Sequence, residues 1–211
     1  MKKLFRGIFV GEEISWHVKF ISDLSRILKP DNYAELGIYQ GETFLKVYAS
    51  HKFAIDISEY ALTFIPNQDN ITKVCGTSES LAKLLDVKNM TLDLLFIDAN
   101  HDYREVINDF SNLLPYLSKK AVVLFHDTYP KTIEFSDPKY CGDAYLSIEI
   151  LAKQNIDWAF TTLPVHPGLS IASQIPLYPD WVHGRSVDIE MLICYILLQS
   201  FQRTESKALT A

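Results

Sequence analysis

The chain has 211 residues, enough for one α/β domain with a sizeable core. Its formal net charge is −6 and it has no long run of Lys or Arg, which disfavours a nucleic-acid-binding surface. Its cysteines, Cys75, Cys141 and Cys194, are widely spaced, form no zinc-binding pattern and indicate a reducing, cytoplasmic setting. The apolar run after the basic start is too short for a signal peptide, and the late apolar stretch 191–198 is too short to span a bilayer.

The first part of the chain alternates predicted helices with predicted strands. Apolar residues at helical spacing predict an amphipathic helix over 12–28, which we expect to cover the sheet or the edge of a ligand pocket. Short apolar runs predict strands at 33–37, 52–56 and 71–75. The helices that follow these strands are predicted to begin near Gly41, Ser58 and Ser78.

The second part continues the alternation and then changes. A nearly all-apolar run predicts a central parallel strand over 92–98, followed by a helix with a capping box at Asp102 and Glu105. The remaining predicted elements are a strand at 121–125, a polar loop at 128–140, a helix at 142–154, and strands at 156–163 and 168–173. Strand–helix units closed by a hairpin predict an α/β fold with a seven-stranded sheet, mostly parallel with an antiparallel last strand, and helices on both faces.

A single domain with three parts is expected: an N-terminal helical cover at 1–30, a ligand-binding core at 31–175 and a C-terminal helix within 176–211. The helix predicted at 188–201 is apolar on nearly all sides, so it must be buried. It could pack on its own domain or form a subunit interface. We favour the interface, which predicts a homodimer.

A glycine turn connects the first predicted strand to its helix. The segment 33–43 contains the pattern Glu35-x-Gly37-x-x-x-Gly41, and the next strand ends in Asp56. A glycine turn after one strand and a carboxylate at the end of the next are typical of a site for a nucleotide-like ligand. The third glycine of the dinucleotide pattern is missing, which favours a nucleoside without phosphates over NAD or FAD.

Polar residues stand at the carboxyl ends of several predicted strands, where ligands bind in parallel α/β sheets. These residues are Asp56, Gly76, Asp98 and Asp127. The segment 76–78 allows two interpretations. Its backbone and hydroxyl groups could contact the edge of an adenine ring, or they could cap the helix that follows.

Asp98, His126 and Asp127 close neighbouring central strands. Carboxylates beside an open pocket suit a hard divalent cation such as Mg²⁺, whereas an imidazole ligand would favour Mn²⁺, Fe²⁺ or Zn²⁺. The alternative is that His126 and Asp127 cap or orient loops.

His101 lies just beyond the fourth predicted strand. Because the pKa of histidine is near neutral, it could take a proton from an attacking hydroxyl. It could instead pack against the ligand or hydrogen-bond Asp98. His166, in the loop of the closing hairpin, is expected to be a surface histidine.

The sequence Phe96-Ile-Asp-Ala-Asn-His-Asp-Tyr103, followed by Val123-Leu-Phe-His-Asp127, resembles the class I S-adenosylmethionine (SAM)-dependent methyltransferases of the macrocin O-methyltransferase and cephalosporin-hydroxylase-like group. The turn at 35–41 and the hairpin at 163–169 resemble this group as well. The resemblance covers about 33–173 and implies a Rossmann-like methyltransferase sheet with SAM as cofactor.

Carried over by position, the resemblance implies a SAM-binding set, with Asp56 on the ribose and Thr77 or Ser78 near the adenine. The set is Glu35, Gly37, Gln40, Gly41, Asp56, Ile57, Gly76, Thr77, Ser78 and Asp98. Asp98 and Asp127 match the metal carboxylates of metal-dependent members. Those members often have a further acid where this chain has His126.

The sequence therefore predicts a SAM-dependent methyltransferase acting on a hydroxyl of a small molecule, such as a sugar or another natural product. A divalent cation, Mg²⁺ or another, held by Asp98, His126 and Asp127 would assist the reaction. Without a metal, His101 would be the base and Asp98 its orienting partner. The alternatives are a non-catalytic methyltransferase-like module for binding or assembly, and an iron-dependent oxygenase, for which no facial-triad pattern is present.

Overall fold

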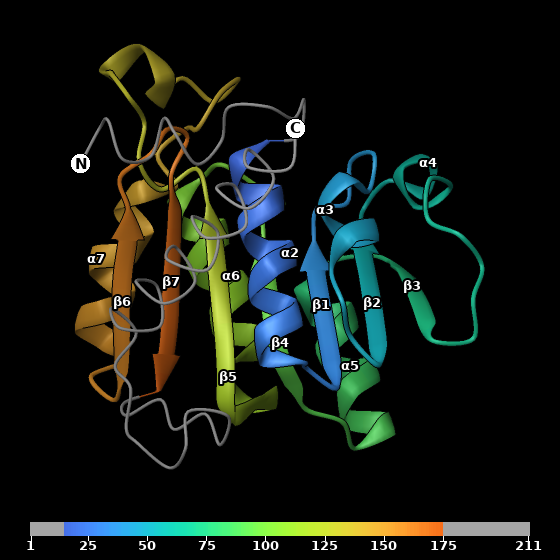
Figure 1. The fold of residues 1–211 in the computed structure, drawn as a ribbon. Helices are drawn as coiled ribbons and strands as arrows, with labels where there is room; N and C mark the ends of the chain where they lie inside the picture. Colours follow the sequence, from blue (N-terminus) through green and yellow to red (C-terminus); the bar gives the residue numbers. More distant parts are fainter. Residues whose placement is uncertain (1–14, 175–211) are drawn as a thin grey trace, which may run out of the picture.

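A seven-stranded sheet forms the centre of the computed structural model, which describes residues 15–174 (Figure 1). The strand order is β3-β2-β1-β4-β5-β7-β6. The strands are β1 (Asn32–Leu36), β2 (His51–Asp56), β3 (Ile71–Cys75), β4 (Leu92–Ile97), β5 (Leu117–His126), β6 (Trp158–Leu163) and β7 (Leu169–Gln174). Strands β1 to β5 pair in parallel, while β7 runs antiparallel to both of its neighbours, β5 and β6. The predicted fold class is confirmed.

Helices cover both faces of this sheet (Figure 1). One face carries α2 (Trp16–Leu28) and α3 (Glu42–Lys46), and the other carries α5 (Ser78–Lys88), α6 (Tyr103–Leu113) and α7 (Tyr145–Gln154). The short helix α4 (Glu59–Leu62) follows β2, and the 3₁₀ turns are Leu114–Tyr116 and Ile133–Ser136.

Strand β4 shows why the central strands are almost entirely apolar, with Asp93 as its one charged residue. All of its residues are buried, and alternate side chains enter different cores. Leu94 and Phe96 belong to the core under α2, whereas Leu95 and Ile97 belong to the core under α6. A strand buried on both faces has no polar side, which explains the continuous apolar run in the sequence.

Some predicted boundaries differ from the structure. Strand β5 begins at Leu117 rather than at 121, and α7 begins at Tyr145 rather than at 142. The later start of α7 follows from a turn, since Gly142 adopts a left-handed φ of 55° and its N–H bonds the Asp137 carbonyl. Asp102 caps α6 as predicted, by accepting from the backbone N–H of Arg104.

The predicted helix at 188–201, and with it the predicted dimer interface, lies outside the described residues. Among the helices of residues 15–174, none has the length and apolarity to cross a membrane.

Candidate active site

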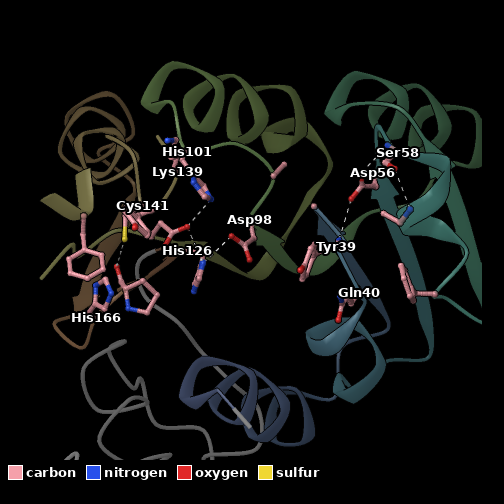
Figure 2. Close-up of a pocket in the computed structure, with 18 of the residues that line it drawn as sticks. Tyr39, Gln40, Asp56, Ser58, Asp98, His101, His126, Lys139, Cys141 and His166 are labelled. Atoms are coloured by element: carbon pink, nitrogen blue, oxygen red, sulfur yellow. Dashed lines mark hydrogen bonds and ion pairs between the residues drawn. The ribbon is translucent and has the colours of Figure 1, made fainter. Parts of the chain in front are cut away.

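The carboxyl ends of β1, β2, β4 and β5 open into a cavity of about 850 Å³ (Figure 2). Polar side chains from these ends lie in its wall, including Asp56, Asp98 and Asp127. Its lining is Gly37, Tyr39, Gln40, Asp56, Ser58, Tyr60, Ala61, Phe64, Asp98, Ala99, His101, His126, Asp127, Phe135, Lys139, Tyr140, Cys141, His166 and Pro167. The predicted position of the site is thus where the structure has its cavity.

Gly37 is required by the neighbouring strand rather than by a ligand. Its φ is +86°, and a Cβ there would lie 2.2 Å from the backbone oxygen of Asp98 and 2.7 Å from the Cα of Ala99. Any side chain would first separate the ends of β1 and β4, which hold the site together.

Asp56 organises the glycine turn and also faces the cavity. Its Oδ2 accepts from the backbone N–H of Ile38 at 2.8 Å, and its Oδ1 accepts from the N–H of Ser58 at 2.8 Å. The turn closes with a hydrogen bond of 2.7 Å from the N–H of Gly41 to the carbonyl of Ile38. Asp56, which lines the cavity, thereby fixes the backbone of the glycine turn at Ile38 and the backbone after β2 at Ser58.

Glu35 lies beneath the cavity rather than in its wall, and its assignment as a cofactor contact stays a prediction. It is 2% exposed and accepts a hydrogen bond from the Tyr33 hydroxyl. Side chains alternate along a strand, so Glu35 shares the buried face of Tyr33, which packs beside Phe44 of α3. Burial raises the pKa of Glu35 to about 8.

The segment after β3 caps a helix. Thr77 is the N-cap of α5 and forms a capping box with Ser80. Ser78 is 2% exposed, and its hydroxyl accepts from Asn112 of α6 at 3.1 Å. The hydroxyl of Ser78 thus joins α5 to α6, and the placement of Thr77 or Ser78 near the adenine stays a prediction.

The remaining predicted cofactor residues differ in where they lie. Gly37, Gln40, Asp56 and Asp98 line the cavity, whereas Gly41, Ile57, Gly76 and Thr77 are not in its wall. The side chain of Ile57 is 78% exposed. A Cβ on Gly41 would lie 2.6 Å from the Cδ1 of Ile65, so this glycine lets the turn pack against Ile65 rather than a ligand or a strand.

Two carboxylates and two imidazoles alternate at the centre of the cavity (Figure 2). His126 Nδ1 lies 2.9 Å from Asp98 Oδ1 and 3.3 Å from Asp127 Oδ2. His101 Nε2 lies 3.0 Å from the same Asp127 oxygen. We call Asp98, His126, Asp127 and His101 the central cluster.

The pKa values in the central cluster favour the charged forms. Burial alone would lower the pKa of His126, but Asp98 and Asp127 overcome this and raise it to about 10. Burial alone would raise the pKa of Asp127, yet hydrogen bonds from His101 and His126 hold it well below its usual range. The hydrogen bond to Asp127 raises the pKa of His101. In this cluster the pKa shifts of His126, Asp127 and His101 each favour the charged form.

His17 of α2 extends this cluster and was not anticipated from the sequence. Its Nδ1 lies 3.3 Å from His126 Nε2 and 2.8 Å from the hydroxyl of Ser15. The ring centroids of His17 and His126 are 4.2 Å apart. Burial, and next the charge of His126, lower the pKa of His17 to about 3, so its ring is neutral. A histidine in an amphipathic helix carries no ligand pattern that could have indicated this role.

His101 is held by Asp127 rather than by Asp98, which corrects its expected orienting partner. Its ring also donates to the Pro138 carbonyl. Its backbone carbonyl accepts from the N–H of Asp143 at 3.0 Å, and a Cβ on Gly142 would lie 2.3 Å from that carbonyl oxygen. The loop before α7 therefore packs directly on the His101 backbone.

The end of the cavity away from the glycine turn, which we call the far arm, is aromatic. The sequence analysis did not predict it. Phe135 lies 4.4 Å from the His166 ring and 5.4 Å from the Tyr140 ring. The expectation that His166 is a surface histidine is wrong, because it lines the cavity. Cys141 is 2% exposed and burial raises its pKa to about 12, so it remains a thiol.

The central cluster does not fit a resident divalent cation. Asp98, His101 and Asp127 bring one donor atom each to within 4.8 Å of one another, and carboxylate oxygens are the ligands that Mg²⁺ prefers. However, N–H groups of His101 and His126 already point at these carboxylates. His126, a predicted ligand, directs its Nδ1 toward the carboxylates and its Nε2 toward His17.

Comparison with known proteins identifies the domain. Residues 34–128 match the model of a family described as a methyltransferase domain. The curated "Uncharacterized protein R132" of Acanthamoeba polyphaga mimivirus is 24% identical over 203 residues, covering 84% of this chain and 89% of that protein.

Solved structures show the same fold. An O-methyltransferase from Bacillus cereus, in complex with SAH, has a TM-score of 0.62 and 16% identity, with 82% of this chain and 89% of that chain covered. The O-methyltransferase TomG from Streptomyces achromogenes, in complex with SAM, has a TM-score of 0.63 and 16% identity, with 82% and 86% covered. The predicted class I methyltransferase fold is confirmed, and residues 34–128 match a methyltransferase domain.

Proposed function

We propose that this protein transfers a methyl group from SAM to a hydroxyl of a small molecule. The observation that carries the proposal is the two-armed cavity with the Asp98 carboxylate between the arms (Figure 2). One arm lies along the glycine turn and Asp56, and the other lies among Phe135, Tyr140 and His166. A methyl transfer needs two such compartments, one for the donor and one for the acceptor, with the reacting atoms in between.

The arm beside β1 and β2 is the SAM arm. The carboxylate of Asp56 would bind the ribose hydroxyls, and the rings of Tyr60 and Phe64 would border the adenine. The SAH of the Bacillus cereus complex and the SAM of the TomG complex support this choice of cofactor.

The chemistry requires alignment and one proton acceptor. The acceptor oxygen forms a bond to the methyl carbon as the carbon–sulfur bond breaks, and S-adenosylhomocysteine (SAH) leaves with both electrons of that bond. The oxygen becomes strongly acidic as it gains the methyl group, so a carboxylate is a sufficient base. We assign the proton to Asp98, which lines the cavity and uses Oδ1 for His126.

His101 then acts as a positioning residue rather than as the base. Its Nε2 is 3.0 Å from Asp127, and its ring also donates to the Pro138 carbonyl. A base must present a free lone pair to the substrate, and the Nε2 of His101 is already occupied by Asp127. His101 fixes Asp127, which in turn holds His126 against Asp98.

Isothermal titration of the full chain with SAH tests the cofactor. We expect wild-type binding and a loss of about ten- to hundredfold in affinity for Asp56→Ala, because a buried hydrogen bond to a charged group contributes roughly 1.5–3 kcal/mol. Asp69→Ala, at an exposed site outside the cavity wall, is the matched control and should bind as the wild type does. Wild-type protein that binds neither SAM nor SAH at millimolar concentration would refute the proposal.

A screen of hydroxyl acceptors, read as a mass increase of one methyl group, tests the reaction itself. Sugars and phenols belong in the screen, since the far arm offers aromatic rings and the cation of Lys139. Binding of SAH without transfer to any acceptor in a broad screen would favour a non-catalytic module.

A further inference from the structure

We propose that the His126 ring takes the place of a divalent cation between Asp98 and Asp127, so that the centre works without a bound metal. The inference rests on the proposed function only for the identity of the site. Its test reads metal binding and requires no methyl transfer.

The first observation is where the ring lies. His126 Nδ1 is within 2.9 Å of Asp98 Oδ1 and 3.3 Å of Asp127 Oδ2, so one N–H faces both carboxylates. The side chain is 11% exposed and packs edge-on against Phe96, which leaves it little freedom to turn away. A cation that bridged these two oxygens would have to displace this N–H.

The second observation concerns the other ring nitrogen. His126 Nε2 lies 3.3 Å from Nδ1 of His17, which the Ser15 hydroxyl also contacts. This nitrogen is therefore directed at α2, away from Asp98 and Asp127. Neither ring nitrogen of His126 is left open to a cation that bridges the two carboxylates.

The third observation concerns the remaining donor set. Asp98, His101 and Asp127 are near enough to share an ion. The Nε2 of His101, however, already lies 3.0 Å from Asp127 Oδ2, so this nitrogen is occupied. A divalent cation here would also meet the His126 ring, whose Nδ1 is within 3.3 Å of both carboxylates.

The carboxylates themselves are of the type that binds metal, so the inference predicts a gain of function. Replacing His126 by an acid removes the positive charge and adds an oxygen ligand beside Asp98 and Asp127. His126→Asp should therefore create the site that the wild-type side chain fills. His126→Asn, which adds a neutral oxygen ligand, should create a weaker one.

The experiment is a titration of the full-length chain with Mn²⁺, in which the electron paramagnetic resonance signal measures the concentration of free Mn²⁺. We expect His126→Asp to bind one Mn²⁺ at least about tenfold more tightly than the wild type, and His126→Asn to fall between them. Adding Asp98→Asn to His126→Asp should abolish the gain. The control His51→Asp, which makes the same exchange at the start of β2, should leave Mn²⁺ binding as in the wild type.

Wild-type protein that binds Mn²⁺ as tightly as His126→Asp, with that binding lost in Asp98→Asn, would overturn the inference. Absence of any gain in both His126 variants, when circular dichroism and SAH titration show them folded, would overturn it too. The SAH titration keeps the two proposals apart, because loss of SAH binding in the wild type contradicts the function and says nothing about Mn²⁺.

Discussion

Glu35 and His126 are both buried ionisable residues, and their surroundings favour the neutral form of Glu35 but the charged form of His126. His126 faces two carboxylates, which favour the protonated, charged ring. Glu35 is buried beside the Tyr33 hydroxyl, and its pKa of about 8 means that it is mostly neutral at pH 7. Lys52, whose charge acts on Glu35, directs its ammonium to the carbonyls of Phe44 and Val47 instead.

The neutral state of Glu35 makes stability depend on pH. Its folded pKa of about 8 lies above the ordinary value of 4.5, so the folded chain holds a proton that the unfolded chain releases. This contribution is fully present below pH 4.5 and is lost as pH rises through 8. We expect the free energy of unfolding of the wild type, relative to Glu35→Gln, to fall by a few kcal/mol between these limits.

Urea unfolding of both proteins at several pH values measures this difference, in which contributions from other groups cancel. Glu79→Gln, an exchange at an exposed acid in the first turn of α5, is the control and should run parallel to the wild type. A Glu35→Gln curve parallel to the wild-type curve would show that Glu35 is ionised in the folded chain.

At the level of elements, the strand ends could be predicted and the loops could not. The acids Asp56 and Asp98 terminate apolar runs, so the edge of the sheet that carries the site was visible in the sequence. The motif at 35–41 does not indicate that Glu35 is buried, because this follows from the alternation of side chains along β1, which places Glu35 on the buried face of Tyr33. Phe135 and His166 meet only through folding of two loops without periodicity.

Helix α2 joins the central cluster to the far arm. His17 contacts His126, and the indole N–H of Trp16 donates to the His166 carbonyl at 3.0 Å. Neither residue falls within the segment matched by the methyltransferase domain family, which begins at residue 34. The first turn of α2 therefore supplies contacts to the site that the domain alone lacks.

Replacing His17 tests this contribution. His17→Phe keeps the ring and removes the acceptor, leaving the buried His126 N–H unpaired, so we expect it to reduce the free energy of unfolding by about 1–3 kcal/mol. In His17→Asn the amide oxygen can replace Nδ1, so most of this loss should be restored. Urea unfolding at pH 7 measures both, with His51→Phe as the control. Equal losses in the Asn and Phe variants would mean that packing, rather than the hydrogen bond, is what His17 provides.

In the whole molecule, the two halves of the sheet build the two arms of the cavity. Strands β1 to β3 and their loops surround the SAM arm, while β5, β7 and the loops at 129–142 and 164–168 surround the far arm (Figure 1). The halves meet between β1 and β4, where Gly37 packs against the backbone of Asp98. The chain adds β2 and β3 on one side of β1, and β4 and β5 on the other side, so the strand order reverses between β1 and β4. Open α/β sheets bind ligands at such positions.

This division predicts that the arms can be altered independently. Phe135→Ala removes the ring that contacts Tyr140 and His166, so kcat/KM for the acceptor should fall about ten- to hundredfold, because an aromatic contact and its buried area are lost. The affinity for SAH, titrated in the absence of acceptor, should stay within about twofold of the wild type. Asp56→Ala, in the other arm, is the comparison variant and should reduce the affinity for SAH. If Phe135→Ala weakened SAH binding as much as Asp56→Ala does, SAH would occupy the far arm and the assignment of the two arms would have to be reversed.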